Sequence, residues 1–263
     1  MSRIEIRCGL LLGAGILIAM VLPGQAQSVP PCTPLPVLLT GLMVPVTADM
    51  KNAPFSATGK QTFEQKLPGG NAIHGVGLSR IARDSSGRTR VETLRRCWHG
   101  QDGNIHASWN VVINDSVAGK SLTWIIDDMA SKVVRVSANP QPPTPEQLAR
   151  SKRETALFQP PQSELQIEDL RTKNINGVSA EGKRTTRKIP VGEEGNDLSM
   201  TTVNEVWTSK QLRQDVMTID DNPRRGRFVF EMEDVKLQEP DASLFAAPTG
   251  YTVEEIKPVN QGR

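Results

Sequence analysis

The sequence predicts a mainly β protein, built as a large curved antiparallel sheet or half-barrel of about ten strands with one inserted short helix. Three observations support this prediction. Short runs rich in β-branched residues recur along most of the chain. Turns containing Gly, Asn or Asp separate these runs at hairpin spacing. No helix-length pattern recurs between the runs, which argues against a parallel α/β core.

Residues 1–26 have the pattern of a secretory signal peptide. Arg3 and Arg7 give a positive start, and an apolar run from Cys8 to Leu22 follows. A retained membrane anchor is the weaker alternative, because this run is shorter than the ~20 residues that a spanning helix needs. We therefore expect cleavage after Ala26 and a secreted or periplasmic protein of the cell envelope. The sequence predicts no transmembrane span after signal removal.

The net charge and the cysteine content indicate which partners and which cellular compartment to expect. A net charge of +2 over 263 residues argues against a nucleic-acid partner. Removing the signal removes Cys8 and leaves Cys32 and Cys97. Two cysteines in an oxidising compartment favour one disulfide bridge between them, with two unpaired thiols as the alternative. The sequence does not predict an oligomeric state.

Prolines dominate residues 27–53, which we expect to form an extended lead-in with one short edge strand near Met43–Thr47. A single β domain follows over residues 54–253, and residues 254–263 form a tail. Turn residues between the apolar runs divide the first half of this domain into strands. These strands are Phe55–Leu67, Val76–Ala82, Thr89–Leu94, Trp109–Ile113, Leu122–Ile126 and Val133–Val136.

A proline-bracketed segment then interrupts the β pattern, and a helix is predicted at about 145–158. Thr144 fits the N-cap, Pro145 the first helical position, and Gln147 the third residue of a capping box. The helix is either a cover for the sheet or an exposed insertion. The second run of strands follows it: Leu165–Thr172, Ser179–Ile189, Ser199–Ser209, Leu212–Asp220 and Arg227–Leu237. Near the end, Phe245 and Tyr251 are expected to pack against the sheet.

Several turn and strand motifs resemble those of a family of uncharacterised secreted bacterial envelope proteins, which has no assigned activity. They include Pro54-Phe55-Ser56-Ala57, Glu205-Val206-Trp207-Thr208-Ser209 and Glu239-Pro240-Asp241-Ala242-Ser243-Leu244-Phe245. More distantly, the strand order and the closing Phe245 and Pro248-Thr249-Gly250-Tyr251 resemble the lipoprotein-carrier (LolA/LolB-like) half-barrel. Folds of that kind hold an acyl chain between a curved sheet and helical lids. The resemblance therefore implies an apolar ligand.

Two loops look like known sites but depart from them. Residues 114–121 end as a phosphate-binding loop does, yet Asn114 replaces its first glycine and a strand follows, so we expect a hairpin turn. Possible metal ligands fall close together in a second loop, but their spacing matches no common metal signature, which favours a solvated loop. These residues are Cys97, His99, Asp102 and His106.

No nucleophile elbow or other catalytic set is present, so we expect a protein that is not an enzyme and has no cofactor or metal. The leading hypothesis is binding of an apolar or lipid-like ligand in the curve of the sheet. The aromatic residues that would line such a site are Trp109, Trp124, Trp207, Phe228 and Phe230. The alternative is a periplasmic protein-interaction or sensing module in which the same residues fill a core. An enzyme of unrecognised type is the second alternative.

Overall fold

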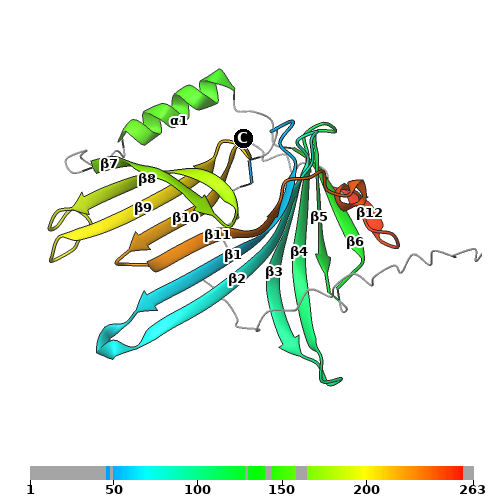
Figure 1. Cartoon of the computed structure of the whole chain (residues 1–263), viewed down its shortest axis with the longest axis horizontal. Coiled ribbons are helices and arrows are strands. Elements are labelled where there is room, and N and C mark those ends of the chain that lie inside the picture. Colours follow the sequence, from blue (N-terminus) through cyan, green and yellow to red (C-terminus); the bar gives the residue numbers. More distant parts are fainter. Residues whose placement is uncertain (1–45, 48–49, 128–129, 140–143, 158–164, 257–263) are drawn as a thin grey trace, which may run out of the picture. The chain divides into compact units, whose positions relative to one another are not determined.

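The computed structural model describes residues 46–47, 50–127, 130–139, 144–157 and 165–256. One open, curved sheet of 12 strands forms the fold, in the order β12-β6-β5-β4-β3-β2-β1-β11-β10-β9-β8-β7 (Figure 1). The predicted fold class is therefore confirmed. The signal segment, most of the lead-in and Cys32 lie outside the described residues.

The first half of the sheet is a run of consecutive antiparallel strands. Hairpin connections keep each strand next to the one before it. At the turn between β2 and β3, Gly87 has a φ of 90° and donates its N–H to the carbonyl of Asp84. The strands are β1 (Phe55–Lys66), β2 (Ala72–Arg83), β3 (Thr89–His99), β4 (Ile105–Asp115), β5 (Lys120–Ile126) and β6 (Val133–Ala138), and η2 (Pro68–Gly70) joins β1 to β2.

Helix α1 (Pro145–Leu157) lies where the sequence predicts a helix, and it begins with the predicted capping box. The N–H of Gln147 donates to Thr144 Oγ1 at 3.2 Å, and the N–H of Thr144 donates to Gln147 Oε1 at 2.8 Å. Residues 145–154 are all exposed. Of the two predicted roles, the exposed insertion therefore agrees with the structure.

The second half of the sheet repeats the hairpin pattern and ends with one exception. β12 pairs with β6 in parallel, so the sheet is mixed where a purely antiparallel one was predicted. The reason is that the chain leaves β11 at the centre of the sheet and crosses to its far edge before β12 begins. The elements are β7 (Leu165–Ile175), β8 (Val178–Ile189), β9 (Met200–Ser209), β10 (Gln214–Asn222), β11 (Gly226–Lys236), η3 (Ala242–Phe245) and β12 (Thr252–Glu255).

Buried apolar residues form two clusters. The Phe230 cluster contains Phe55, Ala57, Ile81, Ile175, Val178, Ala180, Trp207, Leu212, Val216, Phe230 and Met232. The Trp124 cluster contains Ala82, Val111, Ile113, Trp124, Val134, Val136 and Phe245. Ile81 and Ala82 are consecutive on β2, so the two clusters lie on opposite faces of that strand. We call the face of β2–β6 that carries Ala82, Val111 and Trp124 the Trp124 face.

A buried arginine holds the chain before β1 against the sheet. Arg83 Nε donates to the carbonyl of Ala53 at 3.0 Å and Nη1 to that of Thr47 at 3.3 Å, while Nη2 donates to Leu212. Burial, helped by nearby Arg213, lowers the pKa of Arg83 to about 10, so its guanidinium stays charged at neutral pH. Thr47 is not in a strand, and Met43 lies outside the described residues.

Candidate functional site

The aromatic residues predicted to line a ligand site do not gather at one place. Trp124 belongs to the Trp124 cluster, whereas Trp207 and Phe230 belong to the Phe230 cluster. Phe228 is half-buried, with its ring centroid 5.2 Å from that of Phe63. Trp109 is buried on the Trp124 face but lies outside both clusters. A single site lined by all of them is therefore not formed.

The C-terminal segment covers one part of the Trp124 face. Phe245 is buried in the Trp124 cluster, and Leu244, Ala247 and Tyr251 pack against it. Arg90 Nη1 also donates to the carbonyl of Leu244 at 2.7 Å, which fixes this segment over β3. The predicted packing of Phe245 and Tyr251 is thus observed. This part of the face is a filled core.

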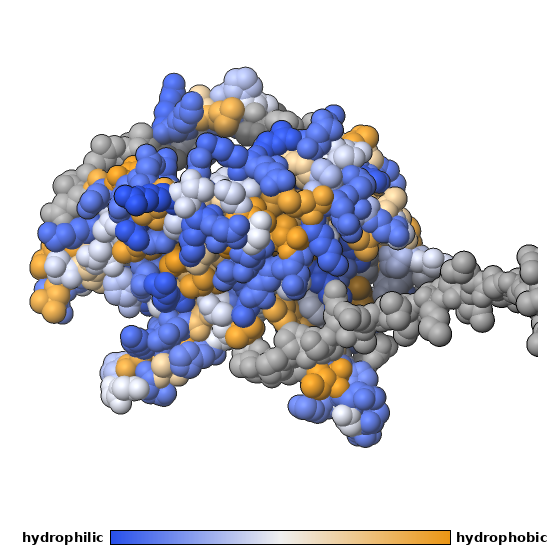
Figure 2. Space-filling view, in the orientation of Figure 1, coloured by the Kyte–Doolittle hydropathy of each residue, from blue (hydrophilic) through white to orange (hydrophobic). Residues whose placement is uncertain are grey.

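The sheet splits beyond the covered part. β2 and β3 pair only from Arg83–Thr89 to Ser79–Thr93. The β1–β2 hairpin continues as far as Lys66 and Ala72, and the β3–β4 hairpin as far as His99 and Ile105. The two hairpins therefore diverge below Ser79 and Thr93, as Figure 1 shows, and their ends form separate projections in Figure 2.

Apolar side chains continue along the Trp124 face into this split. Leu94 pairs with Trp109, and Trp109 pairs with Ile126. Leu78 and Ala107 lie on the same face by strand alternation, and both are half-buried, as Leu94 is. Ile126 is 37% exposed, and Ile105, at the end of the hairpin, is 39% exposed. We call Leu78, Leu94, Ala107, Trp109 and Ile126 the open apolar surface.

Charged side chains lie at the closed end of the open apolar surface. Glu92 is buried and accepts hydrogen bonds from two arginines: from Arg80 Nη1 at 3.2 Å and from Arg90 Nε at 2.8 Å. The guanidinium carbon of Arg80 lies 4.4 Å from the ring centroid of Trp109, and that of Arg90 lies 5.0 Å from the centroid of Trp124. Two cations therefore share one carboxylate between two tryptophan rings.

The two loops singled out in the sequence have simple structures. Asp115 and Lys120 pair at the end of the β4–β5 hairpin, and the Asp115 carboxylate accepts from the N–H of Ala118 at 2.9 Å. Because strand β5 follows, residues 114–121 form the predicted hairpin turn. This geometry is unlike the strand-to-helix turn of a phosphate-binding loop.

The second loop closes the β3–β4 hairpin. His106 Nε2 lies 3.0 Å from Asp102 Oδ1, and its ring stacks on Trp98 at 5.6 Å. Hydrogen bonds from His106 and then Asn104 hold the pKa of Asp102 below its usual range. Within the described part of the chain, no three His, Cys, Asp or Glu side chains are grouped to hold a metal ion. Cys97 is half-buried on β3.

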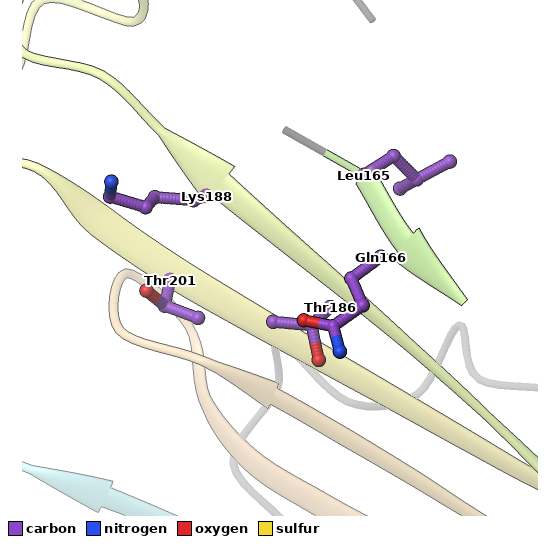
Figure 3. Close-up of a pocket in the computed structure, with 5 residues that line it drawn as sticks. All are labelled: Leu165, Gln166, Thr186, Lys188 and Thr201. Atoms are coloured by element: carbon purple, nitrogen blue, oxygen red, sulfur yellow. The ribbon is translucent and has the colours of Figure 1, made fainter. Parts of the chain in front are cut away.

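A depression of about 300 Å³ lies at the edge of the sheet that ends with β7 (Figure 3). Side chains from β7, β8 and β9 line it: Leu165, Gln166, Thr186, Lys188 and Thr201. β7 is the terminal strand of the sheet, and Leu165 and Ile167 are exposed on it. An exposed edge strand with apolar side chains is a surface to which another strand can add.

Sequence comparisons do not place the chain in a family. No family model matches the sequence, and no curated protein matches it. The resemblance to an uncharacterised envelope family therefore stays a prediction. Among the described residues, no helix is both long enough and apolar enough to cross a membrane.

Solved structures are similar to this chain at low identity. An uncharacterised conserved protein from Thermus thermophilus has 10% identity and a TM-score of 0.39, over 78% of this chain and 91% of that chain. The Pseudomonas aeruginosa MucA/MucB complex has 13% identity and a TM-score of 0.40, over 78% of this chain and 59% of that chain. A LolA superfamily protein from Nitrosomonas europaea has 8% identity and a TM-score of 0.26, over 75% and 91%. All three TM-scores are below 0.5, so the lipoprotein-carrier-like resemblance predicted from the sequence is seen only as a weak structural likeness to this LolA superfamily protein.

Proposed function

We propose that this protein is an exported envelope protein that binds an apolar or lipid-like ligand, without catalysis, on the open apolar surface. The observation that carries the proposal is the incomplete cover of the Trp124 face. The C-terminal segment packs over Trp124, whereas Ile126 and Ile105 on the same face remain more than a third exposed. Large contiguous apolar patches on protein surfaces mark interaction sites or ligand-binding grooves.

The open apolar surface extends over both diverging hairpins, with Leu78 on the β1–β2 hairpin and Leu94 on the β3–β4 hairpin. An alkyl chain lying along it would contact Leu78 from β2, Leu94 from β3 and Ile126 from β5, with the buried ring of Trp109 beneath them. Covering apolar surface contributes about 25 cal/mol per Å², and part of this gain offsets the freedom that a ligand loses on binding. The role of Trp109 in this proposal is the one predicted from the sequence.

Binding is tested with a fluorescent fatty-acid probe, after native mass spectrometry of gently purified protein for bound lipid. Leu94→Asn should weaken probe binding roughly fivefold to tenfold, because it replaces an apolar contact by a polar one. Thr93→Asn is the matched control, since Thr93 is also half-buried but lies on the opposite face of β3. Absence of probe binding by the wild-type protein, with no lipid in the mass spectrum, would reject the proposal.

Export and the disulfide belong to the same proposal. Mass spectrometry of the envelope fraction should find Gln27 as the N-terminal residue, and an intact Met1 terminus would overturn cleavage after Ala26. Peptide mapping without reduction should join Cys32 to Cys97. Recovery of both thiols in alkylated form would remove the bridge from the proposal.

A protein-interaction module remains the alternative, and the β7 edge favours it. An extended segment of an envelope partner would add to β7 by main-chain hydrogen bonds, with Leu165 and Ile167 giving side-chain contacts. Ile167→Pro would remove one N–H donor and block such pairing. Loss of cross-links to envelope proteins in this variant, with fatty-acid binding absent in the wild type, would establish the alternative over the ligand carrier.

A further inference from the structure

The closed end of the open apolar surface carries an excess positive charge. Arg80 and Arg90 share the single carboxylate of Glu92, which leaves one positive charge on the group. The side chain of Arg90 is only 12% exposed, whereas that of Arg80 is 49% exposed. The neighbouring cation Lys60 has its own carboxylate partner, Glu233, at 3.3 Å. The excess charge is therefore presented to a ligand by Arg80.

Arg80 is also placed to hold the head of an extended ligand. It follows Leu78 on the same face of β2, and its guanidinium lies over Trp109. The split begins beside it, at the Ser79–Thr93 pair. A ligand head at Arg80 would thus direct its tail along Leu78 and Leu94.

The guanidinium of Arg80 retains the capacity to bind this head. A guanidinium has five N–H donors in a planar fork that fits a carboxylate. Nη1 is the Arg80 nitrogen that donates to Glu92. The ring of Trp109 on one side lowers the local exposure to water, which strengthens a charged hydrogen bond made there.

From these observations, and on the basis of the proposed function, we infer that the ligand is a long-chain carboxylate. Its carboxylate binds Arg80 and its alkyl chain lies on the open apolar surface. A monoanionic head balances the single excess charge of the Arg80–Glu92–Arg90 group. A neutral head would leave that charge without a partner, and a dianionic head would exceed it.

The test compares dodecanoate with dodecanol, which share a chain length and differ in head charge, by isothermal titration calorimetry at pH 8. Wild-type protein should bind dodecanoate roughly tenfold more tightly than dodecanol, as a charge-assisted hydrogen bond predicts. Arg80→Gln should abolish this preference by weakening dodecanoate binding roughly tenfold. Arg135→Gln is the control, because Arg135 is exposed on the opposite face of β6 and should keep the preference.

The outcomes separate this inference from the proposed function. Equal binding of the two ligands by the wild type, or tighter binding of dodecyl phosphate than of dodecanoate, overturns the carboxylate and leaves an apolar carrier. Binding of neither ligand rejects the carrier itself. Should Arg80→Gln fail to fold, the wild-type preference still has to fall as sodium chloride rises from about 0.05 to 0.5 M, because salt screens a half-exposed ion pair. A salt-independent preference contradicts the inference.

Discussion

Replacing Phe230 by alanine should lower the free energy of unfolding by about 3–5 kcal/mol. Phe230 is 5% exposed in the Phe230 cluster, next to Ile81 and Met232 on the same side of the sheet. A buried phenylalanine removes about 150–250 Å² from water, which at about 25 cal/mol per Å² corresponds to an upper limit of about 4–6 kcal/mol. Alanine would keep a small part of this.

The surroundings of Phe230 are poorly able to fill the resulting cavity. A Cβ on Gly59 would lie 2.8 Å from Phe230 Cε2, so the ring packs directly on a position that has no side chain to move inward. β1 and β10 flank this part of β11 and hold its backbone in register. We therefore expect a loss in the upper half of the range, which corresponds to roughly 10–15 °C in melting temperature for a domain of this size.

The assay is urea unfolding followed by circular dichroism, with Phe228→Ala as the control. Phe228 is two residues away on the same face but only half-buried, so its replacement should cost about 1–2 kcal/mol. A loss below about 1.5 kcal/mol for Phe230→Ala, with an unchanged m-value, would show that the ring borders a cavity and not a filled core. Such a result would support the sequence prediction that Phe230 lines a ligand site.

Two further predictions concern charged residues. Arg83→Met should destabilise the fold by about 3–5 kcal/mol, because it leaves the carbonyls of Ala53, Thr47 and Leu212 without their donor. Urea unfolding measures this change in the free energy of unfolding. A loss under about 1 kcal/mol contradicts the prediction. His106→Ala should raise the pKa of Asp102 toward about 3.9, as followed by carbon-13 NMR of the carboxyl group. The lowered pKa stabilises the folded hairpin above about pH 4, and the stabilisation is lost as the pH falls through the folded-state pKa. An unchanged Asp102 titration in the variant would show that His106 is not the cause.

Local sequence patterns predicted most strands and turns because the determinants are local. Asn176 and Gly177 have φ values of 48° and 89° at the β7–β8 turn, as the Asn-Gly pair predicts. The capping box at Thr144 likewise depends on residues within one helical turn. Strand alternation also placed Phe228 and Phe230 on one face of β11, and their shared register with β1 agrees.

The site was harder to predict because alternation does not say which face is covered, or by what. The C-terminal segment that packs on the Trp124 face lies more than 100 residues away in the sequence. It packs in one cluster with Trp124 but not with Trp109, so the two tryptophans have different surroundings. Arg80 and Glu92 look like ordinary polar positions of a wet strand, and only the register of β2 with β3 joins them. β12 has four exposed residues and no apolar period, so no local pattern indicated it.

The central seam of the sheet has a consequence for the order of folding. β1 pairs with β11, whereas most other neighbours in the sheet are consecutive hairpin strands. Each half of the sheet can therefore form from local contacts. The β1–β11 pairing, however, requires that Gly226–Lys236 has already been synthesised. Contacts this distant in sequence form slowly. A chain cut before β11 would leave β1 as an exposed edge able to pair with other chains. Truncation at the C-terminus should thus cause aggregation rather than release a stable shorter domain.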